Sequence, residues 1–265
     1  MPTALPADLT IRQLASTADY DACVSLQRAT WGDDFRELVP PALLLVGQKI
    51  GGVVAGAFAR EDLVGFVFGL TGLRDGRPVH WSHMLAVAET WRDRGIGRAL
   101  KAFQRDHLVA SGVERMYWTY DPLVARNAHL NLRTLGARVI EYARDLYGTN
   151  PMSHTDRVIG SDRFVVAWDL RVPRPPPDAG NPPLGPLGGE VIASEEDPLP
   201  DIPAVLVAIP ADIHLLKDAD AAGAARWRRA TRRAFEHYLA RGYTVSDVQP
   251  HPHGDGSCYR LERKS

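Results

Sequence analysis

The sequence has few cysteines, no long apolar run and almost no net charge, and each shortage excludes a class of protein. Its two cysteines, Cys23 and Cys258, are too few for a disulfide framework or a cysteine-based metal site. The longest aliphatic runs, such as ALLLV at 42–46, cannot span a bilayer. The N-terminus lacks the basic flank and apolar core of a signal peptide. We therefore expect a cytoplasmic protein that uses no metal and no membrane.

The net charge of −1 leaves no overall field that would attract nucleic acid, so any anion-binding site must be local. The apolar share of 45% and the charged share of 24% are ordinary for a folded globular chain. Nucleic acid is therefore not an expected partner.

A stretch rich in proline and glycine, RVPRPPPDAGNPPLGPLGG at 171–189, is the clearest boundary in the chain. These residues cannot sustain a helix or a strand and are typical of an extended linker. The sequence thus predicts a domain over 1–172, a linker over 173–189 and a smaller α/β extension over 190–265.

Hydrophobic patterns before the linker predict an α+β domain. Strands are expected near 8–13, 51–60, 61–70, 79–87, 114–120, 137–145 and 163–170, and helices near 19–30, 41–48, 96–111 and 127–135. Early hairpins followed by a strand–helix–strand unit indicate a mixed sheet.

The extension repeats part of this order, with strands near 204–209, 243–248 and 257–263 around a helix near 221–240. One interpretation is a degenerate half-repeat of the strand–loop–helix unit at 79–120. In that case the anion-binding loop is lost and the extension serves packing, because DADAAGAARW stands where a glycine loop would be. The other interpretation is that a common unit recurs by chance.

The segment WRDRGIGRAL at 91–100 places two glycines among three arginines where a helix begins. A helix N-terminus exposes unpaired N–H groups and the positive end of the helix dipole. A loop without side chains lets a phosphate reach those groups directly. The segment therefore predicts a pyrophosphate site, with an ordinary helix start as the alternative.

Two common phosphate motifs do not fit this segment. A P-loop requires Gly-Lys-Ser/Thr, but Gly97 is followed by Arg98 and Ala99. A dinucleotide fingerprint requires a third glycine near Leu100 and a place in the first βαβ unit. A protein that binds some other nucleotide diphosphate stays open as an interpretation.

The stretch SHMLAVAETWRDRGIGRAL resembles the acyl-CoA motif of the GNAT N-acyltransferase superfamily. In that motif an apolar strand and a turn lead to Arg/Gln-x-x-Gly-x-Gly/Ala, and the six positions 92–97 match in full. The resemblance covers roughly 8–170 and implies that loop N–H groups hold the CoA pyrophosphate while the strand pairs with the pantetheine arm. The implied CoA-binding residues are Leu85, Ala86, Val87, Arg92, Arg94, Gly95, Ile96, Gly97 and Arg98.

The resemblance also implies direct attack of an amine on the acyl-CoA, for which a base must take the amine proton. His83 is the first candidate, because it has the unperturbed pKa nearest neutrality and lies two residues before Leu85 on the same predicted strand. Strict alternation would put it on the face of Trp81 and Leu85. The alternative is a histidine that packs beneath the sheet. Weaker candidates are His80, Glu89 and Asp121.

The chain departs from the family where a tyrosine usually protonates the leaving thiolate. That tyrosine normally lies four residues before the glycine of Leu-Gly-Phe, but Leu132 occupies its place and Ala137 replaces the phenylalanine. We select Tyr147 as the catalytic acid, and Tyr120, Tyr142 or water remain alternatives.

Asn127 and Asn131 are spaced i, i+4 on the predicted helix near 127–135, so they are expected to share a helix face. We predict that they contact CoA or substrate. Helix capping or simple exposure to solvent would explain them equally well.

The expected function is transfer of an acetyl group, or another small acyl group such as succinyl, from CoA to the amine of a small molecule or amino acid. The alternative is a non-catalytic CoA-binding or regulatory module, which the missing tyrosine favours. The acceptor and the formation of a homodimer stay open.

Overall fold

The computed structural model describes residues 5–6, 8–33, 35–148, 159–172 and 190–263. The chain divides into two compact units, Met1–Trp118 with Trp168–Pro173 and Thr119–Ala167 with Arg174–Ser265. The division predicted from the sequence, 1–172 and 190–265, stays a prediction, because its linker at 173–189 lies outside the described residues.

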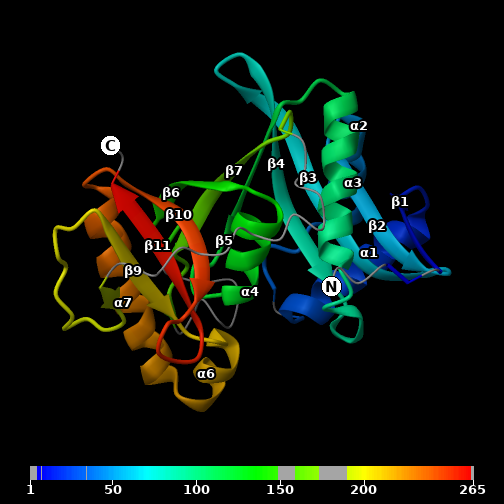
Figure 1. The fold of residues 1–265 in the computed structure, drawn as a ribbon. Helices are drawn as coiled ribbons and strands as arrows, with labels where there is room; N and C mark the ends of the chain where they lie inside the picture. The colour runs from blue at the N-terminus through cyan, green and yellow to red at the C-terminus, as the bar shows by residue number, and fades with distance from the viewer. Residues whose placement is uncertain (1–4, 7, 34, 149–158, 173–189, 264–265) are drawn as a thin grey trace. The chain divides into compact units, whose positions relative to one another are not determined.

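The larger sheet has the strand order β1-β2-β3-β4-β5-β7-β6 (Figure 1). Among its first five strands, neighbours pair antiparallel except β4 and β5, which run parallel, so the predicted mixed sheet is confirmed. The strands are β1 (Leu9–Gln13), β2 (Val53–Ala59), β3 (Asp62–Arg74), β4 (Arg77–Val87), β5 (Arg115–Tyr120), β6 (Arg138–Ala143) and β7 (Arg163–Asp169).

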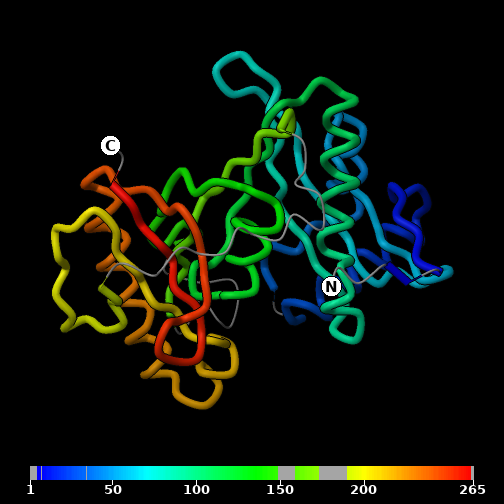
Figure 2. Tube along the Cα trace, viewed as in Figure 1, coloured from blue at the N-terminus to red at the C-terminus, as the bar shows by residue number. Residues whose placement is uncertain are grey.

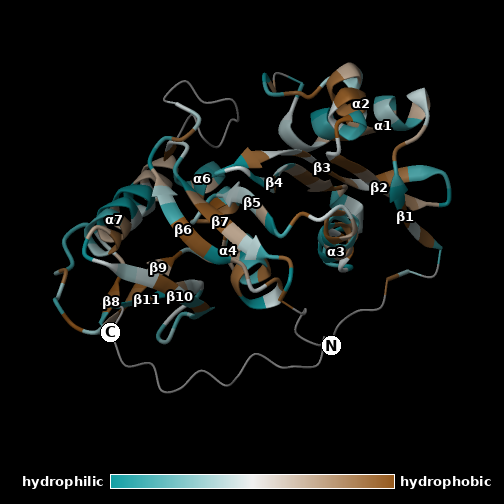
Figure 3. Cartoon of the chain, turned by 90° about the horizontal axis from the view of Figure 1, so that it is seen from above, coloured by the Kyte–Doolittle hydropathy of each residue, from teal (hydrophilic) through white to brown (hydrophobic). Residues whose placement is uncertain are grey.

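In the first unit, helices cover both faces of β2 and β3. Helices α1 (Thr17–Trp31) and α2 (Pro41–Lys49) lie on one face, and α3 (Ile96–Ala110) lies on the other (Figure 3). The core beneath α1 and α2 includes Leu14, Leu44 and Phe66, each fully buried. Because every residue of β2 is buried, this part of the sheet is a rigid base for the neighbouring β4.

The long β3–β4 hairpin extends from the rest of its sheet (Figure 2). It carries a β-bulge between Phe68 and Gly69, which determines the orientation of several predicted site residues. Met84 pairs with Phe68 and Ser82 pairs with Gly69, which leaves His83 as the extra residue. A bulge interrupts the alternation of side chains along a strand. The prediction that His83 and Leu85 share a face is therefore wrong.

The contacts on the two faces show this interruption directly. The His83 ring lies 6.0 Å from the ring of Phe68, which belongs to the core beneath α1 and α2. Leu85 instead lies beside α3, since a Cβ at Gly97 would be 3.5 Å from its Cδ2 atom.

The second unit contains a four-stranded sheet with the order β10-β11-β9-β8. Its helices, α6 (Ile213–Ala219) and α7 (Ala221–Leu239), follow β9 directly in the chain. An aromatic core of Tyr120, Tyr142, Phe164, Phe235 and Tyr259 joins residues of β5, β6, β7, α7 and β11. The strands of this sheet are β8 (Val191–Ile192), β9 (Ala204–Ile209), β10 (Tyr243–Pro250) and β11 (Ser257–Arg263).

The two sheets share a strand pattern. The order β4-β5-β7-β6 recurs as β8-β9-β11-β10. In both, the first pair is parallel and the last pair is antiparallel. The half-repeat interpretation thus gains support, but the strand order aligns different elements of the two units from those that the sequence comparison aligned. Helix α7 lies between β9 and β10, so it takes the place of the helix between β5 and β6 and not the place of α3.

The predicted helix over 127–135 is not a single α-helix. Helix α4 spans Ala125–Ala128 and continues as a π-helical segment, η2, over His129–Thr134. The wider turn of a π-helix changes which side chains share a face, and single-turn π segments occur frequently at functional sites. The simple i, i+4 relation predicted for Asn127 and Asn131 therefore does not apply to this segment.

Candidate active site

The glycine segment forms the tight connection between β4 and α3 in the first unit. A short 3₁₀ turn, η1 (Glu89–Trp91), leads into it, and Asp93 has a φ of 61°. Gly95 is the N-cap residue of α3 with a left-handed φ of 77°. A glycine at this position avoids the strain that a side chain would add.

The N-terminus of α3 is uncapped. No side chain accepts a hydrogen bond from its first N–H groups, and its first turn contains no acidic residue. The helical hydrogen bonds begin with Ala99 donating to the Gly95 carbonyl, so the N–H groups of Ile96, Gly97 and Arg98 precede them. This helix end presents N–H donors and a positive dipole without an internal anion.

Gly97 has no explanation within the fold itself. Its φ lies outside the left-handed region, and a Cβ there would meet only Leu85 Cδ2 at an ordinary contact distance of 3.5 Å. Glycine inside a helix costs roughly 0.5–1 kcal/mol relative to alanine. The missing side chain therefore leaves this backbone open to close approach from outside the chain.

Three arginines surround this helix end. Arg92 Nε donates to the Val87 carbonyl at 3.4 Å, and Arg94 Nη2 donates to the Thr90 carbonyl at 3.2 Å. Arg94 also stacks over the Trp91 ring at 4.8 Å, while Arg98 lies in the first turn of α3. The loop thus gathers positive charge where the helix dipole is positive, which suits a diphosphate.

Strand β4 changes partners before it reaches this loop. On one edge, Leu85, Ala86 and Val87 pair with Val67, Phe66 and Gly65 of β3. On the other edge, the ladder with β5 consists of His80 with Met116 and Trp81 with Tyr117. Beyond Trp81 the two parallel strands no longer pair, as the family resemblance implies for the strand that receives the pantetheine arm.

His83 lies at the bulge, just beyond the end of the β4–β5 ladder. The residue is exposed, although its ring packs edge-on against Phe68. Partial loss of hydration lowers its pKa below the ordinary histidine value of 6.5. The imidazole is thus neutral at physiological pH and able to accept a proton.

The weaker base candidates differ in accessibility. His80 is fully buried and lies within hydrogen-bonding distance of Thr71 and Gln104, and burial lowers its pKa to about 3. Asp121, in the second unit, is buried and ion-paired to Arg228 at 2.7 Å. Glu89 is exposed in η1. Of these three, only Glu89 is open to solvent.

A buried polar cluster beneath β4 was not predicted from the sequence. Lys101 Nζ donates to Ser82 Oγ at 2.8 Å and lies 4.0 Å from the centre of the Trp118 ring. Burial lowers its pKa to about 7. Ser82 in turn donates to Gln104 Oε1 at 2.9 Å. The spacing of Lys101 on α3 gives no sign of this role, since lysine usually lies at the surface.

The remaining predicted residues belong to the second unit. Asn127 is half-buried in α4 and Asn131 is buried in η2. Tyr147 Oη lies 3.0 Å from Thr119 Oγ1, and the Arg163 guanidinium lies over its ring at 5.4 Å. These residues stay predictions as contacts of CoA or as catalytic groups.

The two alternative tyrosines form hydrogen bonds within that unit. Tyr120 Oη accepts from Tyr259 Oη at 3.3 Å, and Tyr142 donates to Asp162. Burial raises the pKa of both phenols above the ordinary value of 10. A phenol that is already hydrogen-bonded and buried is a poor source of a proton for a leaving group.

Across the residues that the structure describes, no three His, Cys, Asp or Glu side chains gather as metal ligands. Within the same ranges, no helix has the length and apolar character needed to cross a bilayer.

Residues 20–137 match the family model of the acetyltransferase (GNAT) family. This part of the chain is therefore a GNAT acetyltransferase domain. It contains the whole β4–loop–α3 segment described above, and it ends at Ala137, just after η2. No relative was found among curated protein sequences.

Solved structures with a similar fold include several acetyltransferases. The ribosomal-protein-S18-alanine N-acetyltransferase of Escherichia coli is 19% identical, with a TM-score of 0.48 over 62% of this chain and 96% of that chain. An acetyltransferase of the GNAT family from Streptococcus pneumoniae is 17% identical, with a TM-score of 0.48 over 61% and 98%. An aminoglycoside 6'-N-acetyltransferase complexed with coenzyme A is 14% identical, with a TM-score of 0.47 over 63% and 99%.

Proposed function

We propose that this chain transfers an acetyl group from acetyl-CoA to the amine of a small molecule or an amino acid. The observation that carries the proposal is the uncapped N-terminus of α3, where Gly97 lacks a side chain for no reason within the fold. The match of residues 20–137 to the GNAT family supports the same assignment. A succinyl or other small acyl group remains compatible with it.

In this proposal the N–H groups of Ile96, Gly97 and Arg98 hold the CoA pyrophosphate, assisted by Arg92 and Arg94. The backbone of Leu85–Val87, on the edge of β4 that faces away from β3, holds the pantetheine arm. When bound, acetyl-CoA supplies the acyl group and a thiolate leaving group.

His83 takes the proton from the attacking amine, directly or through one water. Its lowered pKa keeps it neutral, and its place beyond the end of the β4–β5 ladder leaves it exposed. A backbone N–H of β4 in the same stretch stabilises the negative charge that develops on the carbonyl oxygen. We assign Tyr147 as the donor to the thiolate, with water as the alternative.

Leu132, in place of the usual tyrosine, favours a second candidate, a CoA-binding module without activity. Two measurements on the full chain separate the candidates. Thermal stabilisation by CoA and acetyl-CoA, but not by ATP or NAD, is expected from both. Release of free thiol from acetyl-CoA, dependent on an added amino acid, polyamine or aminoglycoside, is expected only from the enzyme. CoA binding without thiol release across such a panel would support the module.

A further inference from the structure

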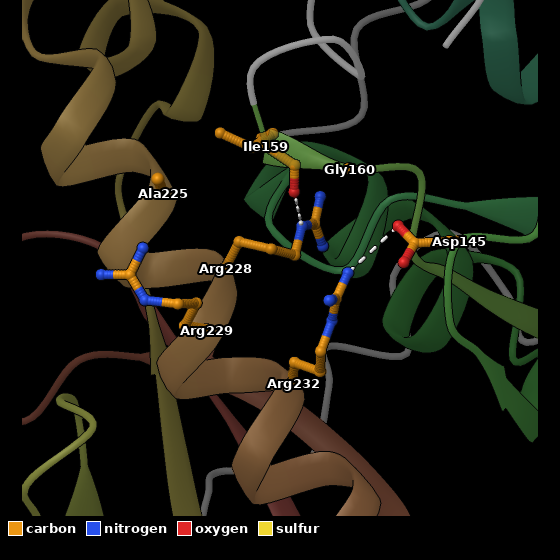
Figure 4. A pocket seen from close by; sticks show the side chains of 7 residues that line it. All are labelled: Asp145, Ile159, Gly160, Ala225, Arg228, Arg229 and Arg232. Carbon is orange, nitrogen blue, oxygen red and sulfur yellow. Dashed lines mark hydrogen bonds and ion pairs between the residues drawn. The ribbon is translucent and has the colours of Figure 1, made fainter. Parts of the chain in front are cut away.

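A cavity of about 240 Å³ lies within the second unit, and none of the residues that line it is assigned to acetyl transfer. Figure 4 shows Arg228 and Arg232 extending from α7 toward Ile159, Gly160 and Asp145, while Arg229 extends to the other side of the helix. Ala225 completes the lining, one turn before Arg228 and Arg229. Three of the seven lining residues are arginines and one is acidic, so the wall is rich in cations.

Arg228 has a buried donor that nothing in the described chain satisfies. Only 2% of the residue is exposed, its Nη2 donates to Asp121 at 2.7 Å and its Nε donates to the Ile159 carbonyl at 3.1 Å. The remaining nitrogen, Nη1, is buried and has no hydrogen-bond partner among the described residues. A buried N–H without an acceptor is costly, and a guanidinium fork suits an oxyanion.

The acidic lining residue is neutralised by its neighbour. Arg232 Nη2 lies 3.1 Å from Asp145 Oδ1 and 2.6 Å from Asp162 Oδ1. The two carboxylates share the Arg232 guanidinium, and Asp145 Oδ2 also lies 3.6 Å from Arg144 Nε, so Asp145 faces two cations. Arg229 extends to the other side of α7 and is paired with Glu195, so Arg228 and Arg232 are the arginines that face the cavity (Figure 4).

A glycine keeps this wall open. Gly160 has a left-handed φ of 83°, and a Cβ there would lie 2.8 Å from Asp145 Oδ1 and 3.2 Å from Arg232 Nη2. Any larger residue would strain the backbone and push the ion pair apart. The glycine that leaves space in the cavity wall therefore lies next to the Arg232 guanidinium.

We propose that this cavity binds a small molecule carrying a carboxylate or phosphate group, which the arginines of α7 recognise and to which Arg228 Nη1 donates. A water occupies about 30 Å³ in the liquid, so the volume suits a ligand of only about eight non-hydrogen atoms. The proposed site is distinct from the α3 N-terminus, and it stands whether or not the chain transfers acetyl groups.

The test fills the cavity without touching the ion pairs. Ala225→Leu extends a side chain into the lining, and Ala222→Leu makes the same change at an exposed position of α7 outside it. Inorganic phosphate and succinate are each titrated calorimetrically into the full chain, with and without saturating CoA. We expect at least one of the two anions to bind at one site per chain. Its affinity should fall at least tenfold in Ala225→Leu and stay unchanged in Ala222→Leu.

A second variant, Arg228→Lys, keeps the positive charge opposite Asp121 but removes the forked guanidinium group. It should weaken the binding of the same anion. The anion that binds identifies the ligand group as phosphate or carboxylate. Binding of neither anion, or equal binding in both leucine variants, would overturn the proposal. The proposal would also be overturned if saturating CoA abolished anion binding while Ala225→Leu left it unchanged. In that case the anion would occupy the N-terminus of α3.

Discussion

Gly95 and Gly97, only two residues apart, are glycines for different physical reasons. Gly95 has a left-handed φ of 77° and closes the turn into α3, so the backbone itself requires it. Gly97 has no such requirement, and a methyl group there would fit against Leu85. The motif therefore separates into Gly95, which the backbone conformation requires, and Gly97, for which we propose the close approach of a ligand.

His83→Ala tests the proposed base. Because a protonated imidazole cannot accept the amine proton, kcat/KM should rise with pH through a limb that lies below 6.5, the ordinary value from which partial burial lowers the pKa. The variant should lose this limb and about 10²- to 10⁴-fold in kcat/KM. The measurement is a pH–rate profile with an acceptor amine of low pKa, so that the amine's own ionisation does not contribute.

His214→Ala is the matched control, because His214 is an exposed histidine on α6. It should leave the profile unchanged. If His83→Ala keeps the wild-type rate and limb, His83 has no part in proton transfer, and the exposed Glu89 or solvent becomes the better candidate.

Helix α3 does more than present its N-terminus. One turn further along, Lys101 places an ammonium group among Ser82, Met116 and Trp118, and within the described part of the chain it forms no ion pair with an acidic side chain. Leu100 and Ile96 of the same helix would contact a Cβ at Gly65, so that β3 glycine lets the helix approach the sheet closely. The position of the ligand-binding end therefore depends on a closely packed helix with a buried charge.

Lys101→Met tests the energetic cost of that charge. Its pKa is about 7 in the folded chain against 10.5 when exposed, so between these values the unfolded chain binds more protons. Stability should therefore rise with pH from 7 to 10.5, by at most about 1.4 kcal/mol per pH unit. Lys101→Met should remove this rise, as measured by urea unfolding at several pH values.

The exposed Lys49 supplies the control, since Lys49→Met removes an equal charge from the surface of α2 and should keep the wild-type slope. Identical slopes in all three proteins would mean that Lys101 is hydrated in the folded state.

The elements that the sequence predicted best are those with a clear apolar period and local stop signals. Strands β1 to β7, the helices of the first unit and helix α7 were all expected near their observed places. The bulge at His83 was missed, because it arises from pairing with β3 and leaves no local mark in the sequence. The π-helical η2 and the short β8 and α6 were also missed, because they too leave no clear local pattern in the sequence. In the site, the motif predicted the loop, whereas the buried Lys101 depends on long-range packing.

At the scale of the whole chain, the recurring strand pattern accounts for the lack of a glycine loop between β9 and β10. Helix α7 takes the place of the helix between β5 and β6, and no helix corresponding to α3 separates β8 from β9 among the described residues. Within the described residues of this unit, no segment therefore corresponds to the loop proposed to bind CoA. If the two units are repeats, the sequence comparison of α7 with α3 aligned helices that the strand order does not place together.

This topology predicts a single CoA site. Calorimetric titration of CoA into the full chain should give one equivalent per chain. Two equivalent sites would mean that the second unit retains a working CoA site, and the proposed alignment of the two strand patterns would be wrong.

The most direct test of the central claim is CoA affinity in Gly97→Ala. The methyl group fits the folded chain, so the free energy of unfolding should stay equal or rise by up to about 1 kcal/mol. The same methyl group should block the pyrophosphate and weaken the binding of CoA about tenfold or more, which corresponds to about 1.4 kcal/mol of binding free energy. Gly72→Ala, inside strand β3 where a Cβ meets nothing within 4 Å, should change stability by a similar small amount and leave CoA affinity unchanged. A folded Gly97→Ala protein that binds CoA as tightly as the wild type would contradict the account, because the pyrophosphate would then not lie at the N-terminus of α3.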